Sequence, residues 1–101
     1  MLDREFFLGF VKIHILYHAS KESIFGVEMT RELARHGYSI SPGTLYPMLH
    51  RLEKEGYLKS TSMVVAGKVR KYYQATDEGK QVLEQSKKRI RELVTEVIEE
   101  K

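Results

Sequence analysis

The chain has 101 residues, which is enough for one domain with a modest hydrophobic core, and its formal net charge is +3. It contains no cysteine, so disulfides and thiolate metal sites are excluded, in agreement with a reducing cytoplasm. No apolar run is long enough to span a membrane, and the N-terminus lacks the layout of a signal peptide. We therefore expect a soluble cytoplasmic protein with no membrane partner.

Residues 4–18 predict a first helix, with Asp3 as its cap. Large apolar side chains fill most of these positions and cover more than one stripe of the helix surface. A helix that is apolar nearly all round is usually buried on two sides. In so small a domain a second subunit can supply the second cover, and we assign Phe6 and Phe10 to that contact.

Residues 25–35 predict a second helix and residues 41–56 a third. Ser41 can cap the third helix by accepting a hydrogen bond from a free amide, Pro42 suits its first position, and Gly56 suits a left-handed position at its end. The apolar face of the third helix consists of Leu45, Met48, Leu49 and Leu52. Two short helices joined by a tight turn form a helix-turn-helix.

The opposite face of the third helix is polar and carries almost no acid until its last turn. It consists of Gly43, Thr44, Tyr46, Pro47, His50, Arg51 and Lys54. Pro47 crowds the carbonyl of Gly43, but glycine has no side chain, so a slight bend of the helix absorbs the conflict. Such a face is either an ordinary solvated surface or a surface for an anion, for which DNA is the strongest candidate.

Residues 57–65 and 69–76 predict the two strands of a β-hairpin, with a turn at residues 66–68. The hairpin is basic, and residues 56–76 hold no acid and four basic residues, Lys59, Lys68, Arg70 and Lys71. The whole excess of positive charge therefore lies in this window. A basic hairpin tip is often only solvated, but the absence of acid here favours a contact with nucleic acid.

Residues 76–100 predict a long final helix with Thr76 as its cap. Its apolar residues form a short heptad-like seam, which includes Leu83, Ile90, Leu93, Val94, Val97 and Ile98. The compact core has little room for this length of helix, so we expect the seam to pair with another subunit. The predicted fold is mainly α with a small β-hairpin (α+β). It is a winged helix-turn-helix domain at residues 1–76 with an additional C-terminal dimerisation helix at residues 77–101, in one compact unit.

Three parts of the sequence resemble the PadR family of bacterial and archaeal transcriptional regulators. The stretch SPGTLYPMLHRLEKEGYL at residues 41–58 is similar to that family's recognition-helix signature. The wing sequence RKYYQAT at residues 70–76, followed by Gly79, resembles its second signature, and FGVE at residues 25–28 resembles the start of its second helix. The resemblance covers most of residues 6–80.

The resemblance implies a homodimeric winged-helix repressor whose first and last helices make the dimer contacts. It also implies that some members release DNA when a small aromatic or drug-like molecule binds. A single C-terminal helix is typical of the short subgroup of the family. The chain has no tryptophan, so the tryptophan-lined drug site of certain members is excluded.

The predicted DNA-binding residues lie on the third helix and the wing. They are Ser41, Gly43, Thr44, Tyr46, Pro47, His50, Arg51, Lys68, Arg70 and Lys71. The helix is expected to enter the major groove of double-stranded DNA by its N-terminal half, and the wing to hold phosphate or the minor groove. The predicted dimer contacts are Phe6, Phe10, Leu83, Ile90, Leu93, Val94 and Val97. A twofold dimer predicts an inverted-repeat operator.

Two other classes of function, an enzyme and a protein-binding module, are alternatives to DNA binding. An enzyme is not predicted, because no nucleophile–base set, phosphate loop or carboxylate pair stands out, and no cofactor is expected. His14 and His18 have the i, i+4 spacing that metals can use, but the sequence places no third ligand near them, so no metal site is predicted. The alternative function is a winged-helix module that binds another protein without sequence-specific DNA binding.

Overall fold

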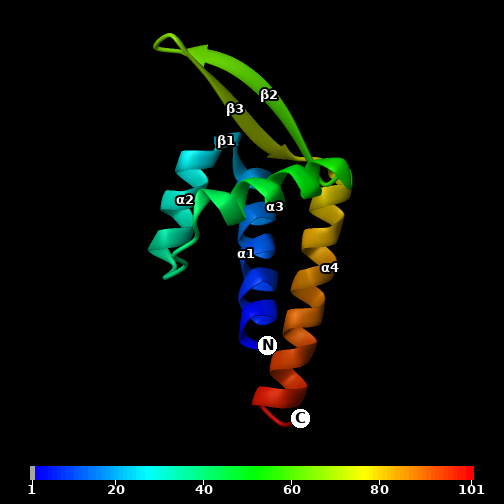
Figure 1. Cartoon of the computed structure of the whole chain (residues 1–101). Helices are drawn as coiled ribbons and strands as arrows, with labels where there is room; N and C mark the ends of the chain where they lie inside the picture. The colour runs from blue at the N-terminus through cyan, green and yellow to red at the C-terminus, as the bar shows by residue number, and fades with distance from the viewer. Residues whose placement is uncertain (1) are drawn as a thin grey trace.

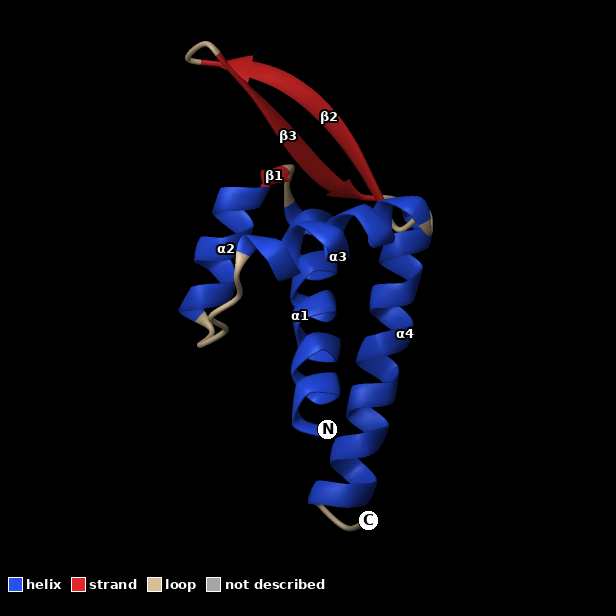
Figure 2. Cartoon of the chain, in the orientation of Figure 1, coloured by secondary structure: helices blue, strands red, loops and turns tan. Residues whose placement is uncertain are grey.

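The computed structural model describes residues 2–101 and confirms a winged helix-turn-helix with a final helix (Figures 1 and 2). In chain order the elements are α1 (Leu2–Lys21), β1 (Ile24–Phe25), α2 (Gly26–Arg35), α3 (Pro42–Lys54), β2 (Leu58–Val65), β3 (Lys68–Ala75), α4 (Asp77–Leu93) and the π-helical turn η1 (Val94–Ile98). The strands form one three-stranded antiparallel sheet in the order β1-β3-β2.

The molecule is elongated, with extents of 55 × 28 × 21 Å. Helices α1 and α4 run side by side in opposite directions, α3 lies across one end of this pair, and the β2–β3 hairpin extends beyond α3 on the side of α2 (Figure 1). Both chain ends lie at the far end of the α1–α4 pair (Figure 1). The hairpin and α3 therefore lie at one end of the molecule, and the free ends of α1 and α4 at the other.

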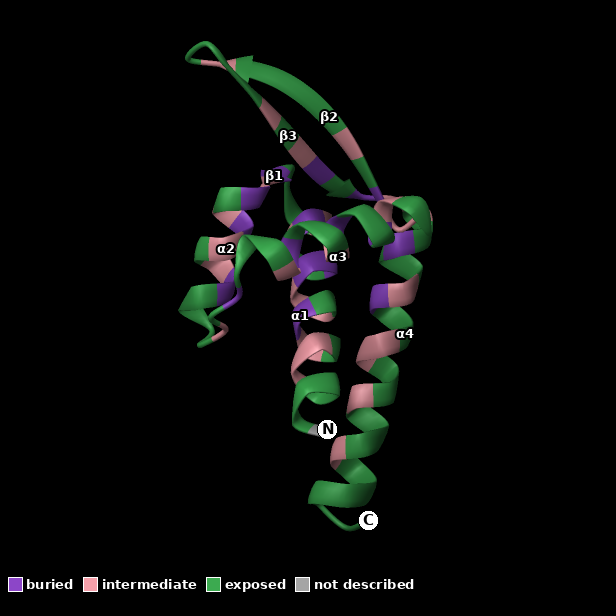
Figure 3. Ribbon diagram, in the orientation of Figure 1, coloured by how far each residue is buried: buried purple, intermediate pink, exposed green. Residues whose placement is uncertain are grey.

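The hydrophobic core lies where α1, α2, α3 and the sheet meet (Figure 3). Its fully buried members include Ile15 of α1, Leu33 of α2, Leu49 of α3 and Tyr73 of β3. The spacing of Leu45, Leu49 and Leu52 directs one face of α3 into this core, as predicted. The lower halves of α1 and α4 are mostly exposed or half-buried (Figure 3), so a single chain does not cover them.

Two predicted helix starts need correction. Asp3 does not cap α1, because the helix already begins at Leu2 and Asp3 lies in its first turn. Ser41 does occupy the N-cap position of α3, but its hydroxyl accepts no amide hydrogen bond and instead donates to Thr44 Oγ1 at 3.3 Å. Helix α3 runs through Pro47 without interruption.

Strand β1 is not predicted by the sequence pattern. Its two residues pair with Tyr73 and Tyr72 of β3, so the sheet has three strands where the sequence predicted a two-stranded hairpin. Two residues are too short for a period-2 pattern to appear, and only the tertiary contact with β3 makes them a strand. The hairpin turn is also tighter than predicted. Ala66 and Gly67, both with positive φ, form a two-residue turn, and Lys68 begins β3.

The final helix also differs from the prediction. Regular α-helix ends at Leu93, and the chain continues as the π-helical turn η1. A π-helical turn holds one residue more than an α-turn, so residues beyond it are rotated relative to a straight heptad seam. Val97 lies inside this turn, so the seven-residue spacing from Ile90 does not run through regular α-helix.

Thr76 joins three parts of the fold. Its Oγ1 accepts a hydrogen bond from the Gly79 amide at 3.0 Å, which confirms the predicted cap, and donates to the Gly56 carbonyl at 2.6 Å. Gly79 packs directly on the chain after α3, because a Cβ at this position would overlap the carbonyl oxygen of Tyr57. The end of α3, the start of the hairpin and the start of α4 are thus locked together.

We expect Gly79→Ala to lower the free energy of unfolding by about 1–3 kcal/mol, because the added methyl forces the backbones apart. In the interior of most helices a change from glycine to alanine raises stability by roughly 0.5–1 kcal/mol. A loss of stability on Gly79→Ala would therefore indicate the close contact with Tyr57. Gly43→Ala is the matched control in the first turn of α3, where the nearest atom to a Cβ is Ser41 Oγ at 3.8 Å. Urea denaturation of both variants measures the difference. A Gly79→Ala variant as stable as the parent would contradict this close packing.

Candidate nucleic-acid interface

A groove with a volume of about 580 Å³ opens between the wing and the helix-turn-helix. Helices α2 and α3 supply one wall, and strands β1 and β3 supply the other. Its lining residues are Phe25, Gly26, Val27, Arg31, Tyr46, Lys68, Val69, Arg70 and Lys71. Of the predicted DNA-binding residues, the structure brings Tyr46 of α3 together with Lys68, Arg70 and Lys71 of the wing around this groove.

Tyr46 lines the groove and packs against Gly26. A Cβ at Gly26 would lie 2.5 Å from the Tyr46 hydroxyl oxygen and 2.7 Å from its ring carbon Cε1, so only glycine allows the ring to pack here. The Tyr46 side chain still remains 39% exposed. The ring is therefore positioned by α2 and keeps part of its surface free for a ligand.

The polar face of α3 is exposed, as predicted. Ser41, Gly43, Pro47, His50 and Arg51 are exposed, while Thr44 is half-buried beneath the first turn. That turn contains no acidic residue, so no carboxylate competes at the positive end of the helix dipole. Pro42 has no amide hydrogen and the Thr44 amide donates to the Ser41 carbonyl at 3.0 Å, which leaves the Gly43 amide as the donor for a ligand in this turn. This arrangement suits an anion at the start of α3.

The three wing cations predicted to bind DNA are not equivalent. Lys71 Nζ lies 3.4 Å from Glu53 Oε1 of α3, and the Ser60 hydroxyl donates to the same carboxylate. The Arg70 guanidinium lies over the Phe25 ring, 4.7 Å from its centroid, in a cation–π contact. Lys68 is exposed at the turn. The charge of Lys71 is therefore partly compensated by an acid from outside the hairpin, which the charge count of the hairpin alone did not reveal.

These contacts lower the pKa of the Glu53 carboxyl group below its ordinary value. The hydrogen bond from Ser60 is the largest cause, and Lys71 also lowers the pKa of the carboxyl from 4.5. A depressed carboxyl pKa contributes stability that is present above pH 4.5 and is lost as the pH falls through the folded pKa. The Glu53–Ser60–Lys71 cluster thus fastens the wing to α3 at neutral pH.

We expect Glu53→Gln to lower the free energy of unfolding at pH 7 by less than about 1 kcal/mol, since the pair is partly solvated. The difference from the parent should shrink as the pH falls below about 4.5. Glu55→Gln, an exposed change at the end of the same helix, is the control. Thermal denaturation of all three proteins between pH 3 and 7 measures the trend, and a pH-independent difference would be inconsistent with it.

Arg31 is a candidate that the sequence analysis missed. It projects from α2 into the groove wall, where it adds a cation to those of the wing. No sequence signal marked Arg31, because α2 and the wing are far apart along the chain and only the fold brings them to one groove. The wing tip also carries an apolar pair that was not singled out. Val64 and Val69 face each other across the hairpin and are each 73% exposed.

The predicted dimer contacts divide into two groups. Phe6, Leu93 and Val97 are 52%, 48% and 63% exposed, and Phe10, Ile90 and Val94 are half-buried. Leu83 is only 4% exposed and belongs to the core of its own chain, so its assignment to a dimer surface is withdrawn. The exposed apolar residues lie on the α1–α4 pair, away from the groove.

Comparison with known proteins assigns the chain to a family. The model of a family described as "Transcriptional regulator PadR-like family" matches residues 15–85. This range includes most of the helix-turn-helix unit, the wing and the start of α4. The chain belongs to the PadR-like family of transcriptional regulators. The resemblance noted in the sequence is thereby confirmed. The family consists of regulators rather than enzymes, in agreement with the expectation that the chain is not an enzyme.

Individual relatives agree with this assignment. Transcriptional regulator Rv3488 of Mycobacterium tuberculosis is 47% identical over 95 residues, which cover 94% of this chain and 89% of that protein. A PadR-family regulator from Eggerthella lenta has a TM-score of 0.86 at 34% identity, with 97% of this chain and 87% of that chain covered. A PadR-like regulator from Bacillus cereus has a TM-score of 0.84 at 34% identity, with 94% of each chain covered.

The PadR-like regulator has no membrane-spanning helix among residues 2–101, since none of the helices there is both long and apolar enough.

Proposed function

We propose that this PadR-like regulator is a homodimeric repressor that binds an inverted-repeat operator in double-stranded DNA. One observation carries the proposal. Tyr46 of α3, Arg31 of α2 and the wing cations Lys68, Arg70 and Lys71 line a single groove. Positive charge gathered on one surface is the electrostatic footprint of DNA binding.

Helix α3 is proposed to enter the major groove with its N-terminal half. The Ser41 and Thr44 hydroxyls can donate to phosphate oxygens, and Gly43 lets the backbone approach closely. The exposed part of the Tyr46 ring can contact a thymine methyl or a phosphate. Arg51 is placed further along α3 to reach a base edge or the backbone. His50 and Pro47 lie on the same face and make secondary contacts.

The wing is proposed to grip the DNA backbone beside α3. Lys68 and Arg70 are assigned the main contacts with phosphate or the minor groove, which position the protein without selecting a sequence. Lys71 has a smaller role than the sequence alone predicts, because its ammonium group is paired with Glu53. Any DNA contact by Lys71 competes with that pair.

The dimer is proposed to form through the exposed apolar residues of α1 and α4. We propose that a twofold axis beside the α1–α4 pair presents both copies of α3 to the same DNA duplex, roughly 34 Å apart, which is one turn of DNA and the usual spacing in helix-turn-helix dimers. Phe6, Phe10 and Ile13 line a shallow depression of about 230 Å³ on α1. We assign release by a small aromatic effector to this depression, where an apolar ligand would alter the dimer geometry.

Selection of bound fragments from the genome of the source organism tests this function. We expect the selected fragments to share an inverted repeat, and their affinity to fall steeply with salt because each phosphate contact releases counterions. The alternative, a module that binds another protein, predicts no shared sequence. Addition of small aromatic compounds to the same selection tests for an effector.

A further inference from the structure

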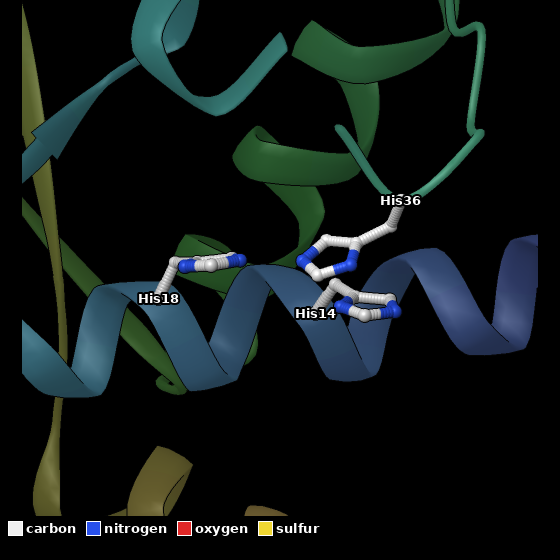
Figure 4. A group of neighbouring side chains, drawn as sticks. All are labelled: His14, His18 and His36. Atoms are coloured by element: carbon white, nitrogen blue, oxygen red, sulfur yellow. The ribbon is translucent and has the colours of Figure 1, made fainter. Parts of the chain in front are cut away.

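Three of the four histidines in the chain gather in one cluster, which the DNA-binding function does not use. His14 and His18 project from the same side of α1, one turn apart, and His36 reaches across from the end of α2 (Figure 4). The sequence alone shows the i, i+4 spacing of the first two but places no third ligand near them. The fold supplies it, because the end of α2 packs beside the middle of α1.

The cluster has dimensions close to those of a metal centre. One ring nitrogen of each histidine can be chosen so that the three lie within 4.8 Å of one another. The His14 and His36 ring centroids are 4.6 Å apart, and those of His18 and His36 are 5.9 Å apart. Zinc binds histidine nitrogen at about 2.0–2.1 Å, so the nitrogens must approach each other by roughly an ångström. His36 is exposed and follows the end of a helix, so rotation of its side chain can provide this movement.

A second observation points to a ligand in the cluster. His18 Nε2 is buried and has no hydrogen-bond partner among the described residues. An unpaired buried nitrogen is costly and calls for a partner. Burial, as the largest cause, lowers the pKa of His14 and of His18. Both rings are therefore biased to the neutral form, which is the form that coordinates a metal ion.

We propose that His14, His18 and His36 form a binding site for a divalent transition-metal ion, with zinc as the reference ion. Imidazole nitrogens suit zinc, nickel and copper, whereas calcium and magnesium prefer oxygen ligands. Three histidines leave a fourth position of a tetrahedral ion open to water or another ligand. The bound ion would tie the middle of α1 to the segment that leads from α2 into the recognition helix.

The charges around the cluster are balanced. Glu32 and Glu22 act on His18 in the direction that favours positive charge, and Arg35 opposes them. Arg35 is itself paired with Glu32 at 3.3 Å, so its charge is partly cancelled. The neighbouring charges therefore neither repel a metal ion strongly nor bind one by themselves. The preference for a transition metal comes from the three imidazole ligands.

Calorimetric titration of the full chain, freed of any histidine tag, with Zn²⁺ tests the site. We expect one ion per chain. His36→Asn should weaken binding by at least about 100-fold, more than the loss of an outer partner of a metal ligand usually causes. His14→Asn and His18→Asn should do the same. His50→Gln removes the fourth histidine, which lies on α3 outside the cluster, and should leave zinc affinity unchanged. Circular dichroism of each variant reports its fold.

His36 is the decisive position, because it is exposed and its replacement leaves the core intact. Tetrahedral Co²⁺ gives visible absorption bands, and these should appear with the parent protein and be lost in His36→Asn. Absence of stoichiometric zinc binding by the parent would overturn the proposal. So would zinc affinity that is equal in the parent and in His36→Asn, since the ion would then be bound elsewhere.

Discussion

Leu93→Glu combined with Val97→Glu is expected to convert the protein into a monomer and to weaken operator binding on the order of 1000-fold. Both side chains are largely exposed in the single chain, so the change should cost the monomer little stability. In the proposed dimer they are covered, and two glutamates per subunit would be desolvated beside their symmetry mates. A monomer reads one half-site, and its affinity should fall from the range of specific complexes toward that of non-specific ones.

Sedimentation velocity and operator titration by fluorescence anisotropy measure the two effects of this double variant. Leu93→Met combined with Val97→Ile is the matched control, because it keeps the surface apolar and should keep the dimer and the affinity. Thermal denaturation shows whether the glutamate variant is folded. A glutamate variant that still dimerises would place the interface elsewhere. A parent that is monomeric at micromolar concentration would refute the dimer itself.

Lys68→Ala combined with Arg70→Ala is the change expected to affect DNA binding most among the wing substitutions. Affinity should fall by roughly 10- to 100-fold on specific and non-specific DNA alike, because the wing contacts phosphate and not base edges. The slope of log affinity against log salt should decrease in magnitude by about 2, close to one unit for each lost phosphate contact. Lys71→Ala should have a smaller effect than either single change, since Lys71 is paired with Glu53.

The control for this experiment removes two positive charges from α4 instead of from the wing. Lys80→Ala with Lys88→Ala changes two exposed residues of α4, outside the groove, and should leave the salt slope close to that of the parent. Mobility-shift titrations at several salt concentrations compare the wing double variant, its two single changes, Lys71→Ala and the α4 double variant with the parent. Equal losses for the wing and α4 variants would show that net charge alone governs binding. A change in sequence preference on wing substitution would also contradict the assignment, because base reading is attributed to Tyr46 and Arg51 of α3.

The fold was largely predictable because its signals are local. The leucine spacing of α3, the left-handed glycine after it and the Thr76 cap each depend on a few neighbouring residues, and the structure confirms all three. The failures concern features that have no local signal. Strand β1 has only two residues and is defined by its pairing with Tyr72 and Tyr73. The π-helical turn after Leu93 has no distinct residue pattern that marks it in advance.

The candidate site was predictable only in part. The exposed face of α3 and the basic wing follow from helical period and charge count, which the sequence displays directly. The sequence could not show that Arg31 lies in the wall of the same groove, because α2 and the wing are far apart along the chain. It also could not show that Glu53 pairs with Lys71 of the wing, or that the Tyr46 ring packs against Gly26 where a larger residue would overlap it.

The sequence by itself determined the order of the elements, the polar face of α3 and membership of the PadR-like family, since these depend on periodicity and on short motifs. Only the tertiary structure decided which charged groups are free and which are paired, and which apolar residues are left uncovered. It also decided that His36 lies beside His14 and His18. The physical reason is the same in each case. Charge pairing, burial and metal coordination act through distances in space, and folding brings together residues that the sequence separates.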